Sequence, residues 1–128
     1  MLRSKLALWL PVAAYMAAIF WFSAQPVLPG VALLPDWLSH DWLHHGAAYA
    51  GLAVVTLRAV AAGDWRRVTI VTLLAAWAIA VAYGISDEFH QSFVPGRTPD
   101  ARDLLADAAG AALGLGAVWA WSIIRRSS

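Results

Sequence analysis

Long apolar segments alternate with short polar ones along the chain, and four of the apolar segments approach the length of a membrane span. A helix needs about 20 mainly apolar residues to cross a bilayer. The segments cover about residues 6–23, 41–62, 68–85 and 99–124, and the third reaches residue 91 if its helix continues into the polar stretch that follows. The pattern predicts an all-α membrane protein, with one domain over residues 1–128 built as a bundle of four transmembrane helices.

The composition agrees with this prediction and excludes several classes of site. The chain is 61% hydrophobic and 13% charged, whereas a soluble domain carries about 25% charged residues. It has no cysteine, which excludes disulfides, thiolate nucleophiles and cysteine-based metal sites. The net charge of +1 gives no reason to expect a nucleic acid as partner, so the bilayer itself is the first partner expected.

The charged residues divide unequally between the two ends of the expected bundle. With four spans, both termini and the loop at 63–67 share one side, which holds seven of the nine basic residues: Arg3, Lys5, Arg58, Arg66, Arg67, Arg125 and Arg126. The opposite side holds seven of the eight acids: Asp36, Asp41, Asp87, Glu88, Asp100, Asp103 and Asp107. Because short cytoplasmic loops are enriched in Lys and Arg, we expect both termini in the cytoplasm and the acidic end on the extracytoplasmic side of a plasma membrane.

One stretch, residues 83–107, holds seven of the chain's seventeen charged residues. Within it, Pro95 and Gly96 suit the central positions of a type II turn, because proline fixes φ and glycine accepts a positive φ. Thr98 is then expected to cap the fourth helix, with Pro99 at its first helical position.

The fourth helix carries two acids and two glycines on one face. Asp103, Asp107, Gly110 and Gly114 follow at intervals of three or four residues, so they line up along the helix. The two glycines have the spacing that lets another helix approach closely. This face is therefore expected to look into the bundle.

Polar residues one helical turn apart also occur on the second and third segments. They are Asp41, His45 and Tyr49 on the second, with His44 pointing elsewhere, and Tyr83, Asp87 and Gln91 on the third, with Glu88 about 100° round from Asp87. Three helices therefore offer polar groups to one pocket at the outer end of the bundle. An acid near the centre of a span costs about 2.5–3.5 kcal/mol to insert, and such residues usually mark a functional site.

A structural role for the same residues is the alternative. Asp100 and Asp103 suit the capping of a helix N-terminus, and Arg97 or Arg102 suits an ion pair that holds the loop. An adjacent pair of acids opposite a histidine on another helix is harder to explain in this way.

The chain resembles the VanZ-like family of small bacterial membrane proteins. The resemblance rests on "DWLHH", "FSAQP" and "SDEFHQSFVPGRTPDARDLLADAAGAALG". The family shows, in this order, an Asp with a His four residues later, an Asp-Glu-x-x-Gln block, a Pro-Gly-Arg turn, an Asp and a glycine-rich fourth helix. In this chain the corresponding residues are, in the same order, Asp41 with His45; Asp87, Glu88 and Gln91; Pro95 to Arg97; Asp103; and Gly110 with Gly114. Two positions depart from it: Trp42 stands where Lys is frequent, and Asp107 stands where Asn is common, which makes this pocket more acidic.

The resemblance implies a place in the cell envelope but no defined reaction. The best-known member of the family is associated with resistance to teicoplanin, a glycopeptide that binds cell-wall precursors outside the membrane. Such a role fits a polar site on the extracytoplasmic side.

Three functional hypotheses follow. In the first, the outer pocket engages a lipid-linked or cell-wall-related ligand, with Arg97 on an anionic group. The ligand would be oriented by the remaining pocket residues: Asp41, His45, Asp87, Glu88, Gln91, Asp103 and Asp107. In the second, the protein is an intramembrane hydrolase or transferase. In the third, it is a structural or partner-binding protein. Four short helices leave little room for an enclosed cavity, which favours a homodimer or a site completed by lipid.

The enzyme hypothesis has specific candidates but no standard motif. Glu88 or Asp87 would act as general base and His45 as its partner. The sequence shows no metal-ligand motif of known spacing, although carboxylates and a histidine suit a divalent ion. No cofactor or resident metal is therefore expected from the sequence.

Overall fold

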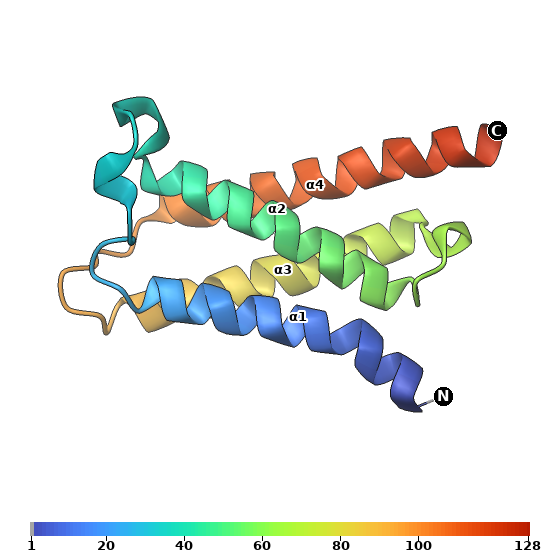
Figure 1. Cartoon of the computed structure of the whole chain (residues 1–128), viewed down its shortest axis with the longest axis horizontal. Helices are drawn as coiled ribbons and strands as arrows, with labels where there is room; N and C mark the ends of the chain where they lie inside the picture. The colour runs from blue at the N-terminus through green and yellow to red at the C-terminus, as the bar shows by residue number, and fades with distance from the viewer. Residues whose placement is uncertain (1) are drawn as a thin grey trace.

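Four antiparallel α-helices lie side by side in a computed structural model that describes residues 2–128, with side chains from residue 4 onward (Figure 1). They are α1 (Leu2–Ser23), α2 (Asp41–Val60), α3 (Ile70–Gln91) and α4 (Ala101–Ser127). Three short 3₁₀ turns lie in the connections: η1 (Val31–Leu33), η2 (Asp36–Leu38) and η3 (Trp65–Arg67). The prediction of an all-α bundle of four helices is confirmed.

The connections sort to opposite ends of the bundle. Both termini and the α2–α3 connection lie at one end, whereas the α1–α2 and α3–α4 connections lie at the other (Figure 1). Residues 24–40 form the longest connection, and they fold across the end of the bundle as two short turns. This alternation brings together the polar ends of α2, α3 and α4.

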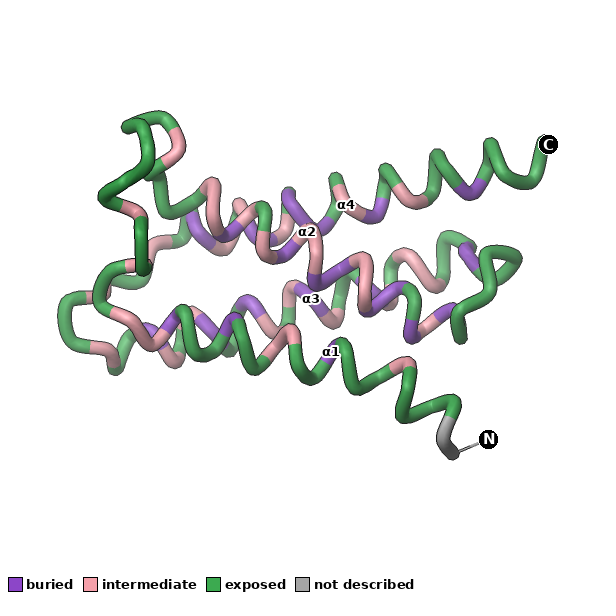
Figure 2. Tube along the Cα trace, in the orientation of Figure 1, coloured by how far each residue is buried: buried purple, intermediate pink, exposed green. Residues whose placement is uncertain are grey.

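Helix α2 is the central element of the bundle, and it differs from the other three in polarity. It packs against α1, α3 and α4, and only four of its 20 residues are exposed (Figure 2). Three helices, at Ser4–Ser23, Ile70–Gln91 and Ala101–Ser127, are long and apolar enough to cross a membrane, and α2 is not among them. A helix that its neighbours shield from lipid does not need a uniformly apolar surface, so the prediction that α2 also crosses the membrane stays a prediction.

The helix ends correct some of the predicted boundaries. The third helix does extend to Gln91, and its start is set by Thr69, whose hydroxyl accepts the backbone N–H of Thr72. The fourth helix begins at Ala101, not at Pro99, and its cap is Asp100 instead of Thr98. The Asp100 carboxylate accepts the Arg102 backbone N–H at 2.9 Å, a role that aspartate fills as well as threonine does.

The turn before α4 agrees with the sequence. Gly96 has a φ of +81°, and the Arg97 N–H donates to the Val94 carbonyl oxygen at 3.1 Å. A positive φ at the third position of the turn is the requirement that the Pro-Gly pair predicted.

Helices α2 and α4 cross with their backbones in contact. A Cβ atom on Gly110 would overlap the carbonyl group of Gly46, and one on Gly114 would lie 2.7 Å from the Ala50 carbonyl oxygen. The glycine spacing on α4 therefore serves the close approach that the sequence predicted. Asp107 lies one turn before Gly110, so the same crossing presses its side chain against α2.

We predict that Gly110→Ala lowers the thermal unfolding temperature of the detergent-solubilised protein. The added methyl group must separate α2 from α4, and overpacking of this kind costs about 1–3 kcal/mol. Gly116→Ala is the matched control, because a Cβ atom at this exposed position of α4 meets nothing within 4 Å. Equal unfolding temperatures for the two variants would contradict the backbone contact.

Candidate functional site

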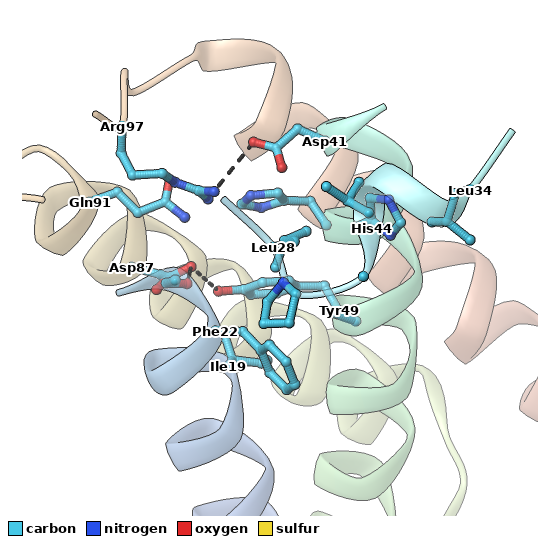
Figure 3. A pocket seen from close by; sticks show the side chains of 16 residues that line it. Ile19, Phe22, Leu28, Leu34, Asp41, His44, Tyr49, Asp87, Gln91 and Arg97 are labelled. Atoms are coloured by element: carbon cyan, nitrogen blue, oxygen red, sulfur yellow. Dashed lines mark hydrogen bonds and ion pairs between the residues drawn. The ribbon is translucent and has the colours of Figure 1, made fainter. Parts of the chain in front are cut away.

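A cavity of about 380 Å³ opens at the end of the bundle away from the termini. Its walls come from α1, α2, α3 and both connections at that end (Figure 3). The lining residues are Ile19, Phe22, Ser23, Leu28, Pro29, Gly30, Val31, Leu34, Asp41, His44, His45, Ala48, Tyr49, Asp87, Gln91 and Arg97. The cavity is therefore not enclosed by four helices alone: residues 24–40 form one of its walls.

One part of the cavity wall is apolar. Ile19 and Phe22 contribute from the last turns of α1, and Leu28, Val31 and Leu34 contribute from the connection to α2. In Figure 3, Ile19 and Phe22 lie below Asp87 and Tyr49, and Leu28 lies above Tyr49 in the middle of the cavity. This part of the wall suits a hydrocarbon group.

A polar part of the wall centres on Asp87. The Ser23 hydroxyl donates to Asp87 Oδ2 at 2.8 Å, and the Tyr49 hydroxyl donates to the same oxygen at 3.5 Å (Figure 3). Among the described residues, Asp87 Oδ1 and Gln91 Nε2 are buried without a hydrogen-bond partner. An acceptor and a donor without partners in a cavity wall are free to bind a polar group that enters it.

Arg97 supplies the positive charge at the mouth of the cavity. Its Nη2 lies 3.8 Å from Asp41 Oδ2 (Figure 3), and 9% of its side chain is exposed. Arg102, five residues later, has 83% of its side chain exposed and pairs with Asp100 at 3.1 Å. The backbone N–H of Arg102 and then its guanidinium hold the pKa of Asp100 below its usual range. The two arginines of this end therefore differ: Arg97 faces the cavity and Arg102 faces outward.

A second polar cluster surrounds His45, where α2, α3 and α4 meet. His45 Nδ1 lies 2.9 Å from Asp107 Oδ1, and His45 Nε2 lies 3.9 Å from Asp103 Oδ2. Glu88 approaches from α3, so that one ligand atom each of His45, Glu88 and Asp107 lie within 4.8 Å of one another. A second set with the same spacing consists of Asp41, His45 and Asp103.

The structure divides the eight predicted site residues into two groups that share His45. Five of them line the cavity: Asp41, His45, Asp87, Gln91 and Arg97. The other three, Glu88, Asp103 and Asp107, gather around His45 instead. That these residues bind a ligand stays a prediction.

Three polar cavity residues were not among the predicted ligands. Tyr49 was placed on the pocket-facing side of the second helix but not listed as a ligand, and Ser23 was missed although it begins the "SAQP" junction; both donate to Asp87. His44 was expected to point elsewhere, and this was wrong, because it lines the cavity together with Leu34. The connection 24–40 covers the first turns of α2, so the cavity takes in a wider arc of that helix than one face.

With this arrangement established, comparison with known proteins identifies the family. The VanZ/LLP1 family matches residues 4–124, nearly the whole chain. The chain belongs to this family. It is therefore a multi-pass membrane protein of a bacterial family, as the resemblance and the three apolar helices indicate. No curated protein and no solved structure matches it significantly.

Proposed function

We propose that this VanZ/LLP1 protein binds an amphiphile with an anionic head group, such as a lipid-linked phosphate, from the extracytoplasmic side of the membrane. The observation that carries the proposal is the division of the cavity wall into an apolar part and a polar part with a guanidinium at its mouth. Its volume of about 380 Å³ lies in the lower range of ligand sites, about 300–1,000 Å³. It suits a head group and the first part of a chain.

Arg97 is the residue expected to hold the head group. A guanidinium presents donors in a plane that matches phosphate or carboxylate. Its partner Asp41 has 48% of its side chain exposed and lies 3.8 Å away, and such pairs contribute little to stability. An anionic ligand therefore replaces a weak ion pair, while Gln91 offers a further donor from the cavity wall.

The apolar chain of the ligand is expected to leave towards the bilayer. The connection beside the cavity exposes large apolar side chains, with Val27 at 67%, Leu33 at 89% and Trp37 at 68%. Large apolar side chains exposed together mark a contact with lipid or with a partner, and Trp is frequent at the membrane interface. A hydrocarbon chain bound along Phe22 and Leu28 would continue past these exposed side chains into the bilayer.

The orientation belongs to the same proposal. Helix α2 is taken as a fourth span, shielded by the other three helices, because it runs antiparallel to α1 and α3 along the bundle (Figure 1). The end with the termini then carries most of the Lys and Arg and faces the cytoplasm. The cavity opens on the opposite side.

We predict that Arg97→Ala weakens the binding of farnesyl phosphate to the purified protein by about 10- to 100-fold. Loss of a hydrogen bond to a charged group costs about 1.5–3 kcal/mol, which corresponds to this change in Kd. The measurement is calorimetric titration in detergent, with Arg102→Ala, five residues later in the first turn of α4, as the matched control.

The probe has its own control. Farnesol has the same chain without the phosphate, so it should bind weakly and equally to the wild type and to both variants. Equal affinity of Arg97→Ala and Arg102→Ala for farnesyl phosphate, or no binding to the wild type, would count against the proposed function.

We also predict the accessibility of single cysteines, which can be introduced without background because the chain has none. In spheroplasts, a membrane-impermeant maleimide should label Thr98→Cys before lysis, and Asp64→Cys and Ser128→Cys only after it. Labelling of position 64 before lysis would contradict the proposed orientation. The reverse pattern at all three positions would place the cavity on the cytoplasmic side.

A further inference from the structure

The geometry points to a divalent metal site formed by His45, Glu88 and Asp107, one residue from each of α2, α3 and α4. Their ligand atoms lie within 4.8 Å of one another. The inference goes beyond the proposed function, because it depends on these side chains alone and requires no amphiphile.

The first argument is the balance of charge around His45. Asp87, Asp103 and Asp107 are all buried, and the half-buried Glu88 lies beside them. His45 is the basic side chain paired with Asp103 and Asp107, since Arg97 pairs with Asp41. Buried ionised groups are stable only when they are paired or bound to a metal. A divalent cation would supply the positive charge that His45 alone does not.

The second argument is the set of oxygen atoms without partners. Asp107 is fully buried, yet among the described residues its Oδ2 has no hydrogen-bond partner, and neither has Glu88 Oε1. Asp107 Oδ1 lies 2.9 Å from His45 Nδ1. Ligand distances of about 2.0–2.2 Å place adjacent ligands of one ion roughly 3 Å apart. The spacing of His45 Nδ1 and Asp107 Oδ1 therefore already suits two ligands of one ion.

The other nitrogen of the His45 ring has a suitable neighbour as well. Nε2 lies 3.9 Å from the Asp103 carboxylate. Histidines that bind a metal commonly direct the second ring nitrogen to a carboxylate, which orients the ring. Asp103 is thus a positioning residue in this assignment, and Nδ1 is the ligand atom.

The alternative set, Asp41, His45 and Asp103, is less suited to a cation. Asp41 is exposed and forms an ion pair with Arg97, whose positive charge repels a metal ion. Among the described residues, neither Glu88 nor Asp107 forms an ion pair with an arginine or a lysine. We therefore assign the metal to His45, Glu88 and Asp107, the inner set; Asp41, His45 and Asp103 are the outer set.

The donor atoms indicate the kind of metal. One imidazole nitrogen and two carboxylate oxygens suit Zn²⁺ or Mn²⁺ better than Ca²⁺ or Mg²⁺, which prefer oxygen alone. His45 also lines the cavity, so an ion held there would add positive charge beside a bound anionic head group.

The test is a titration of the purified protein with ZnCl₂, with no amphiphile present and no polyhistidine tag. After removal of metal with EDTA, the wild type should bind one Zn²⁺ per chain, and its unfolding temperature should rise. Glu88→Gln should lower the affinity at least 10-fold. Asp41→Asn should bind like the wild type, and so should His44→Asn, which controls for a neighbouring histidine.

Each of the following results would overturn the assignment of a metal to the inner set. If the wild type shows no saturable binding, there is no metal site, whatever the variants do. If Asp41→Asn loses the ion and Glu88→Gln keeps it, the ion occupies the outer set. Should Glu88→Gln fail to fold, Asp107→Asn replaces it, and unchanged affinity in that variant would equally exclude the inner set. Because no amphiphile is used, these outcomes are independent of the Arg97 result.

Discussion

The contact between the backbones of α2 and α4 is the constraint on which the rest of the structure depends. Gly46 and Gly110 meet without side chains between them, and this fixes the two helices in register. Asp107, one turn away on α4, is thereby placed 2.9 Å from His45. Packing of small residues, a main source of helix association in lipid, thus positions the buried pair of His45 and Asp107.

Among the described residues, the buried histidine and acidic side chains gather at one end of the bundle, between the helices: His45, Asp87, Asp103 and Asp107. Helix α2 carries His45 and is shielded by its three neighbours, so the cost of placing acids and histidines at this depth is met by mutual contacts instead of by lipid. The buried acidic side chains turn either towards His45 or towards the cavity. A bundle that only needed stability could have filled this region with apolar residues, which is why we assign the cluster a function.

Local patterns predicted the helices, the Pro95-Gly96 turn and the convergence of α2, α3 and α4, because each depends on the spacing of a few neighbouring residues. Features that depend on distant contacts were not predictable. The path of residues 24–40 across α2 decides that His44 lines the cavity, and no local pattern sets that path. Likewise His45, Glu88 and Asp107 are far apart in sequence, so they match no metal-binding sequence motif. Their ligand atoms come together only when the helices pack.

The central claim, that the cavity holds an anionic amphiphile, is tested most directly by photocrosslinking in living cells. A benzophenone amino acid in place of Phe22, which lines the cavity, is compared with one in place of Phe93, which is 71% exposed. Mass spectrometry of the adducts should show a phosphate-bearing lipid enriched at position 22, and the enrichment should disappear in Arg97→Ala. Capture of the same bulk phospholipids in equal proportions at both positions would contradict the account.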